Sequence, residues 1–176
     1  MIVEAARQTG VASFRGIPLY TTQAGGYAGA CMTLHTLFLA TPGIDVALLV
    51  LRLFIGGCFV VHALGKLGLV GTGSMAGFVA WLRAEGVPYP AVQARLAMLA
   101  ELFGGTGLAL GLLARPACLL LIVTMVVAAR VGHKGAGYLI TNDPPGAEYT
   151  INLATVCFAL AWTGPGVFSL DALLFP

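Results

Sequence analysis

Four long apolar stretches constrain the fold more than any other feature of this 176-residue chain. They run over residues 45–69, 96–113, 116–131 and 149–163. A helix needs about 20 apolar residues to cross the hydrocarbon core of a bilayer. Open sheets leave backbone groups unsatisfied there, whereas helices do not. The sequence therefore predicts an all-α integral membrane protein built as a four-helix bundle, whose two shorter spans extend into the interfaces or thin the bilayer.

The low charge content supports the same fold class. Hydrophobic residues make up 59% of the chain and charged residues only 9%, against about 25% in an average domain. Nine basic and seven acidic side chains cannot cover a soluble surface, so membrane lipid is the expected surrounding. A net charge of +2 gives no basic footprint for nucleic acid. The four cysteines form no CxxC pair, and no spacing specifies a metal site.

An interfacial helix is predicted between the first two spans, within residues 71–92. Its apolar residues recur at helical spacing: Met75, Phe78, Val79 and Leu82. This pattern is typical of a short amphipathic segment that lies at the membrane surface. Pro88 and Pro90 are expected to end it.

The N-terminal 42 residues differ from the predicted membrane domain, residues 43–176. They hold no long apolar run, so no cleavable signal peptide is expected. Their Gly, Thr and Ala content predicts a poorly ordered extension. One hypothesis is that translation starts at Met32.

Glycines are concentrated in the second span, at positions 104, 105, 107 and 111. Small residues let helix backbones approach closely in lipid. Packing within the bundle is the preferred interpretation, and a homo-oligomer contact through the Gly107 and Gly111 pair is the alternative.

Seven ionisable side chains within or near the ends of the spans are functional candidates, because a charged group is costly in the membrane. They are Arg52, His62, Lys66, Glu101, Arg130, His133 and Glu148. Spans that alternate in direction place the ends of the first and third, and the starts of the second and fourth, at one membrane surface. All of these residues except Arg52 are therefore expected in one leaflet.

Each candidate also has a structural interpretation. Lys66 and Arg130 can extend to the headgroups, and His133 can be an ordinary loop residue. Glu148 can favour a helix N-terminus through the helix dipole. Glu101 must be paired or protonated, because a free carboxylate is too costly in an apolar helix. A pair with Lys66 or Arg130 would be either part of a site or only a structural link.

Three segments carry a family resemblance: LRLFIGGCFVVHALGKLGL, ELFGGTGLALGLLARPA and the ending GPGVFSLDALL. With His133, Gly137-Tyr138 and Glu148, they resemble the DoxX family of small four-helix membrane proteins over residues 45–173. One departure is Ala63, where the family often has Gly. The resemblance implies a multi-pass protein of a bacterial-type cytoplasmic membrane.

The same resemblance suggests a redox role. Relatives include the DoxD-type subunit of thiosulfate:quinone oxidoreductase, which implies quinone as a cofactor. A mycobacterial relative brings a superoxide dismutase and a sulfurtransferase together, which implies soluble redox or sulfurtransferase-type partners.

Three functions stay open. The first is the membrane subunit of a quinone-linked oxidoreductase, with Glu101, His133 and Lys66 as catalytic groups. Quinone would then be bound among Arg52, His62, Lys66, Glu101, Arg130, His133 and Glu148. No flavin, haem or dithiol motif is visible, so electrons would come from a partner. The second is a non-enzymatic scaffold or assembly factor, and the third is a small transporter, for which no inverted repeat is visible.

Overall fold

The computed structural model describes residues 13–14, 17–18 and 41–175. Strands β1 (Ser13–Phe14) and β2 (Ile17–Pro18) form one antiparallel pair. The strands and the helices belong to separate units of the chain. Most of the predicted extension over residues 1–42, including the hypothetical start at Met32, lies outside the described residues.

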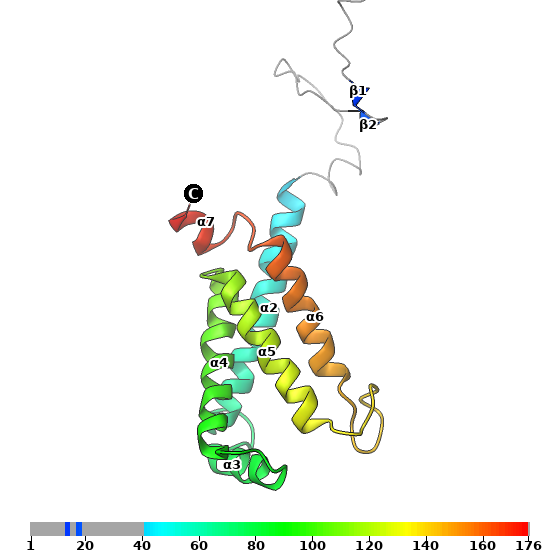
Figure 1. Ribbon diagram of the computed structural model, residues 1–176. Helices are drawn as coiled ribbons and strands as arrows, with labels where there is room; N and C mark the ends of the chain where they lie inside the picture. Colours follow the sequence, from blue (N-terminus) through cyan, green and yellow to red (C-terminus); the bar gives the residue numbers. More distant parts are fainter. Residues whose placement is uncertain (1–12, 15–16, 19–40, 176) are drawn as a thin grey trace, which may run out of the picture. The chain divides into compact units, whose positions relative to one another are not determined.

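From residue 41 to residue 175 the described chain is helical, which confirms the all-α prediction for this part (Figure 1). The helices are α2 (Thr41–Leu67), α3 (Met75–Ala84), α4 (Pro90–Leu110), α5 (Ala114–Gly132), α6 (Glu148–Thr163) and α7 (Leu170–Leu174). α2, α4, α5 and α6 correspond to the four apolar stretches, although the first stretch extends two residues past the end of α2 and the second three residues past the end of α4. The predicted interfacial helix is α3, which buries Leu82.

The start of α4 differs from the prediction. The sequence predicts that Pro90 ends the preceding helix, but α3 ends at Ala84 and Pro90 is the first residue of α4. Proline is favoured there because its missing N–H has no partner in the first turn of any helix. Glu101 consequently lies about three turns into α4, deeper than the apolar run by itself indicated.

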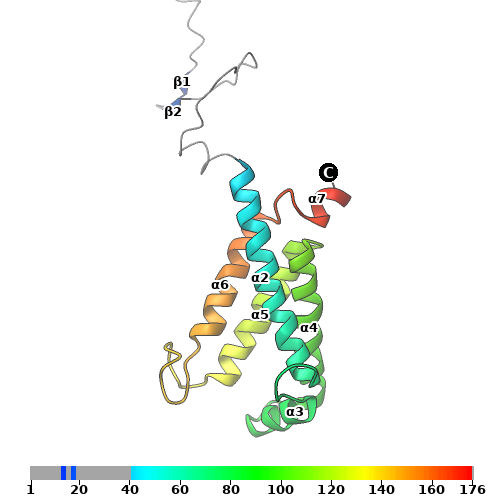
Figure 2. The ribbon, with the colours of Figure 1, turned by 180° about the vertical axis from the view of Figure 1, so that it is seen from behind.

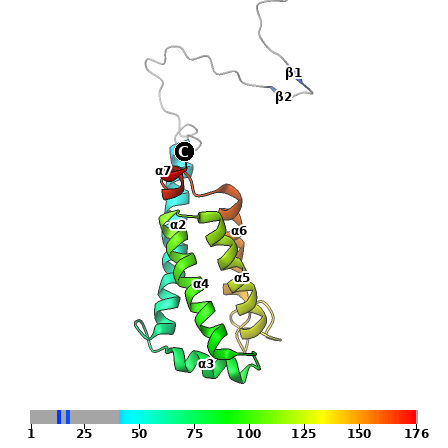
Figure 3. The ribbon, with the colours of Figure 1, turned by 60° about the vertical axis from the view of Figure 1, so that its left-hand side comes forward.

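The four long helices alternate in direction and lie side by side, as Figures 1 and 2 show from opposite faces. α2 packs mainly on α4, and α5 packs on both α4 and α6. α3 lies across the end at which α2 finishes and α4 begins (Figure 3). The ends of α2 and α5 and the starts of α4 and α6 therefore lie at one end of the helical unit, as the sequence predicted.

α2 and α4 touch backbone to backbone at Gly56 and Gly105. A Cβ atom built on Gly56 would lie 2.5 Å from the Gly105 carbonyl oxygen, and one on Gly105 would lie 2.7 Å from the Gly56 carbonyl oxygen. A Cβ atom built on Gly104 would similarly lie 3.0 Å from the side chain of Leu121 in α5. The predicted packing within the unit thus uses Gly104 and Gly105. Gly111 instead lies past the end of α4, where a φ of 65° suits glycine.

The interior and the outer surface of the helices are both apolar. Ten buried residues form the core: Ile55, Phe59, Leu108, Ala117, Cys118, Leu121, Met125, Leu153, Cys157 and Leu160. Every long helix also exposes large apolar side chains, such as Phe54 at 76% and Trp162 at 79%. An outer surface of this kind is unfavourable in water and suits a hydrocarbon solvent.

Two described helical segments are long and apolar enough to cross a membrane: Gly43–Leu67 and Ala114–Gly132. α6 has 16 residues, which span about 24 Å against a hydrocarbon core of about 30 Å. α4 has 21 residues and is long enough, but it carries Gln93, Arg95 and Glu101.

Candidate functional site

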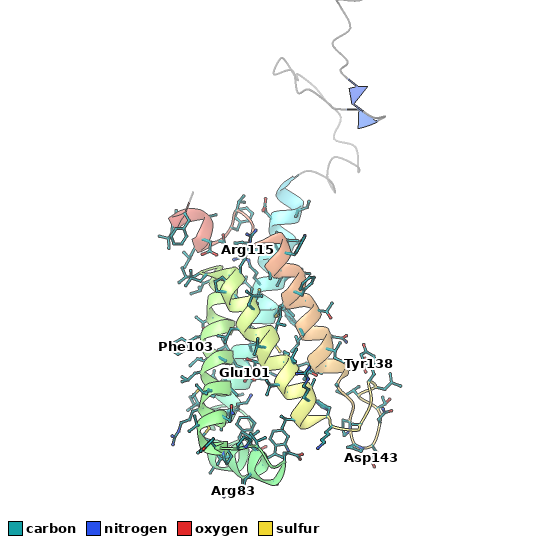
Figure 4. The ribbon with its side chains drawn as sticks, in the orientation of Figure 1. Arg83, Glu101, Phe103, Arg115, Tyr138 and Asp143 are labelled. Carbon is teal, nitrogen blue, oxygen red and sulfur yellow. The ribbon has the colours of Figure 1, made fainter. Side chains whose placement is uncertain are left out.

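A buried ion pair links the last turn of α2 to the middle of α4. Lys66 Nζ donates a hydrogen bond to Glu101 Oε2, and the two side chains are only 18% and 6% exposed. Glu101 points between the helices, whereas Phe103, two residues further along α4, points outward (Figure 4). A buried carboxylate is tolerated when it is paired in this way. Of the two partners that the sequence left open, the structure selects Lys66.

Lys66 also lines a groove between the end of α2 and α3. The groove has a volume of about 570 Å³. Its lining residues are Val61, His62, Gly65, Lys66, Val70, Thr72, Gly73, Ser74, Gly77, Phe78 and Trp81. The segment between α2 and α3 folds back against the last turns of α2. A Cβ atom built on Gly73 would lie only 2.5 Å from the Gly65 carbonyl oxygen, so the close approach requires glycine at position 73. Ser74 then starts α3 by accepting a hydrogen bond from the Gly77 amide at 3.1 Å.

Two aromatic rings of α3 form one wall of the groove. The rings of Phe78 and Trp81 stack with centroids 5.8 Å apart and an angle of 12° between their planes. Lys66 Nζ lies 5.2 Å from the Phe78 ring centroid, within the range of a cation–π contact. The ammonium group is therefore held between a carboxylate and an aromatic face at the edge of an open groove.

A tyrosine that the sequence did not single out as a site residue joins α6 to α2. The Tyr149 hydroxyl lies 2.9 Å from His62 Nε2 and 2.9 Å from Cys58 Sγ. Cys58 and His62 are four residues apart, so they share one face of α2. The sequence shows this shared face, but only the packing of α6 brings Tyr149 to it.

Two predicted site residues instead organise the segment between α5 and α6. His133 Nδ1 lies 2.7 Å from the Pro145 carbonyl oxygen, and Glu148 Oε2 accepts a hydrogen bond from the Ile140 amide at 3.0 Å. Arg130, in the last turn of α5, lines a separate cleft between α5 and α6. Hydrogen bonds thus join Lys66 to Glu101 and His62 to Tyr149. Among the described residues, no hydrogen bond joins His133, Glu148 or Arg130 to either of these pairs.

Arg52 lies toward the other end of the helices, as expected. It is fully buried and donates a hydrogen bond to the Phe168 carbonyl oxygen after α6. Its Nε and Nη1 atoms have no hydrogen-bond partner among residues 41–175. It is therefore placed apart from the Lys66–Glu101 pair, although the sequence grouped it with the binding residues.

Asp171 holds the C-terminal segment to the start of α5. Its carboxylate accepts hydrogen bonds from the amides of Leu113 at 2.7 Å and Ala114 at 2.9 Å. Its own amide donates to the Gly111 carbonyl oxygen at 2.8 Å. A carboxylate at a helix N-terminus satisfies free N–H groups and interacts favourably with the helix dipole. Within the described part of the chain, no group of three His, Cys, Asp or Glu side chains converges as a metal site would require.

The apolar outer surface and the two segments long enough to span a bilayer are typical of a helical integral membrane protein. The profile of the DoxX family matches residues 47–134, half of the chain, and the protein belongs to this family. The chain is 29% identical over 132 residues to the inner membrane protein YphA of Escherichia coli (strain K12). That alignment covers 72% of this chain and 89% of YphA. No solved structure matches the chain significantly.

Proposed function

We propose that the chain crosses a bacterial-type cytoplasmic membrane four times. α2 and α5, which contain the two segments that qualify as spans, run in the same direction in Figure 1. Because α2 and α5 are parallel, the chain must return across the same thickness through α4. The exposed apolar side chains of α4 and α6, such as Phe103 and Trp162, are compatible with lipid contact. YphA is an inner membrane protein, which supports the same location.

Cysteine labelling distinguishes four spans from two. Thr72 follows α2 and Thr141 follows α5, and both are exposed. Each is replaced by cysteine in a background whose four native cysteines are serine, and a membrane-impermeant maleimide is added to intact cells. Four spans place both positions on one side, so both react or neither does. If only α2 and α5 crossed, the two positions would react from opposite sides, and the proposal would be rejected.

The proposed ligand of the groove beside Lys66 is the head group of an isoprenoid quinone. The single observation that carries this proposal is an ammonium group paired with a buried carboxylate at the edge of an aromatic-walled groove. Ligand sites of this type combine apolar and aromatic walls with a few convergent polar groups. Lys66 and His62 both line the groove and can donate hydrogen bonds to quinone carbonyl oxygens.

The chemistry assigned to the site is proton delivery during quinone reduction. Conversion of a quinone to a quinol takes up two electrons and two protons. In the proposal the electrons come from a partner redox protein, and Lys66, in contact with Glu101, supplies a proton at the groove. His62, which contacts Tyr149 at 2.9 Å, offers a second proton-transfer group on the same helix. The chain then acts as the quinone-binding membrane subunit of an oxidoreductase complex.

Bound quinone in the purified protein tests this assignment. The chain is purified in a mild detergent, and isoprenoid quinone is quantified by mass spectrometry in wild type, Glu101→Gln and Phe78→Leu. Phe103→Leu is the matched control, because this ring points outward from α4 and away from the groove. About one quinone per chain is expected in wild type and in the control, with loss in the other two variants. Background quinone in all four proteins would reject the assignment.

A second candidate function is a membrane scaffold for soluble enzymes. It is favoured by the ordered segment between α5 and α6, which His133, Tyr138 and Glu148 hold by hydrogen bonds. This segment lies at the same end of the helices as α3 (Figure 1). It exposes the polar residues Thr141, Asn142 and Asp143 beside the apolar Leu139 and Ile140. A scaffold tolerates Glu101→Gln but loses co-purifying partners when residues 139–144 are replaced by a Gly-Ser linker.

A further inference from the structure

A second recess, which the proposed quinone site does not use, lies between α5 and α6. This α5–α6 cleft has a volume of about 370 Å³. Its lining residues are Met125, Val126, Ala129, Arg130, Thr150, Ile151, Ala154, Thr155 and Phe158. The Thr150 and Thr155 hydroxyls donate to the backbone carbonyl oxygens of Ala147 and Ile151, at 2.8 and 2.9 Å. The one hydrogen-bond donor of each hydroxyl is therefore used within the chain. Most of the residues that line the cleft are apolar.

One end of the α5–α6 cleft is positively charged. Arg130, in the last turn of α5, is exposed and lines the cleft. Lys134 is also exposed; it follows two residues after the end of α5 and is not itself one of the lining residues. The one ion pair recorded among the described residues joins Lys66 to Glu101, so Arg130 has none within that part of the chain. Glu148, the first residue of α6, is turned to the Ile140 amide. The charged end of the cleft is therefore complementary to an anion.

The length of the cleft matches one leaflet of a bilayer. From Thr150 to Phe158 the lining residues cover eight steps along α6, or about 12 Å. Half of the hydrocarbon core measures about 15 Å. Arg130 lies at the end of α5, where a four-span arrangement places the headgroups. The apolar wall thus extends inward from the height at which a lipid phosphate lies.

We propose that the α5–α6 cleft binds an anionic phospholipid, with an acyl chain along its apolar wall and the phosphate held by Arg130 and Lys134. Basic clefts between transmembrane helices have the chemistry that anionic headgroups require. A guanidinium group adds geometric selectivity because it can donate two parallel hydrogen bonds to phosphate oxygens. This inference rests on the proposed four-span arrangement but not on the quinone assignment.

Native mass spectrometry of the detergent-purified protein tests the headgroup contact. The protein is mixed with phosphatidylglycerol or with phosphatidylcholine of the same acyl chains, and retained lipid is counted per chain. Wild type is expected to retain one phosphatidylglycerol in preference to phosphatidylcholine. Arg130→Gln is expected to lower that preference about fivefold, as the loss of one basic contact implies. Arg83→Gln is the matched control, since Arg83 is an exposed arginine at the end of α3.

A second pair of variants tests the apolar wall. Ala154→Leu fills the cleft, whereas Ala159→Leu adds the same atoms at an exposed position of α6 outside the lining. Only Ala154→Leu should reduce retention of both lipids. Equal retention of the two lipids by wild type, or unchanged preference in Arg130→Gln, would overturn the proposal. Retention of an isoprenoid quinone that Ala154→Leu removes would identify another occupant and would also overturn it.

Failure of the lipid-site proposal can be distinguished from failure of the proposed four-span arrangement. If Thr72 and Thr141 label from one side but the lipid preference is absent, only the lipid site fails. Should Ala154→Leu not fold, the exposed variants Arg130→Gln and Arg83→Gln still decide the headgroup contact.

Discussion

Replacement of Gly56 by alanine should separate α2 from α4. The added Cβ would lie 2.5 Å from the Gly105 carbonyl oxygen, 2.7 Å from the Ala109 nitrogen and 2.9 Å from the Ala109 Cβ. The first two atoms belong to the backbone, so no side-chain rotation relieves the overlap. To reach ordinary contact near 3.4 Å, the helices must move apart by about 0.9 Å. A gap of 0.5–1 Å forfeits about a quarter to a half of each dispersion contact along the interface.

The expected loss in the free energy of unfolding for Gly56→Ala is about 1–3 kcal/mol, as for other overpacked sites. Gly57→Ala is the matched control, because its Cβ meets nothing within 4 Å. The control should gain about 0.5–1 kcal/mol, since alanine has the higher helix propensity. Unfolding in mixed dodecyl maltoside and SDS micelles, followed by circular dichroism, measures both changes. Equal stability of the two variants would refute the close contact between α2 and α4.

Two further predictions concern the polar contacts. Lys66→Met should lower the free energy of unfolding by about 3–5 kcal/mol, because it leaves the Glu101 carboxylate buried without a partner. The double variant Lys66→Met with Glu101→Leu should recover most of this loss in the same unfolding assay, and no recovery would contradict a paired carboxylate. Asp171→Ala should cost about 1–2 kcal/mol by removing the cap of α5, whereas Asp171→Asn, which keeps one acceptor oxygen, should cost less. Faster hydrogen exchange at the Leu113 and Ala114 amides in the alanine variant would locate the effect, and unchanged exchange would contradict it.

The polar contacts at the two ends of the helices differ in character. At one end Lys66 and Glu101 sit beside a groove that is open to a ligand. At the other end, Arg52 donates a hydrogen bond to the Phe168 carbonyl oxygen in the C-terminal segment. Asp171 accepts a hydrogen bond from the Leu113 amide at the start of α5. The Lys66–Glu101 pair and the contacts of Arg52 and Asp171 therefore lie at opposite ends of the helices and share no residue.

The boundaries of two of the four long helices could be predicted from the sequence, because hydrophobicity is a local property. α5 and α6 begin and end within two residues of the predicted limits. The first turns of α4 were missed because Gln93 and Arg95 interrupt the apolar pattern while the backbone is already helical. The grouping of Lys66 and Glu101 at one end also followed from the sequence, since four alternating helices allow only one arrangement of their ends.

The sequence alone determined the helical class, the apolar outer surface and the end of the helices at which most ionisable residues lie. The tertiary structure decided which of these residues meet: Glu101 pairs with Lys66, Tyr149 joins Cys58 to His62, and Arg52 reaches Phe168. Periodicity fixes which residues share a face of one helix. It does not fix how each helix is rotated toward its neighbours, because that rotation depends on close contacts between distant segments, such as Gly56 against Gly105.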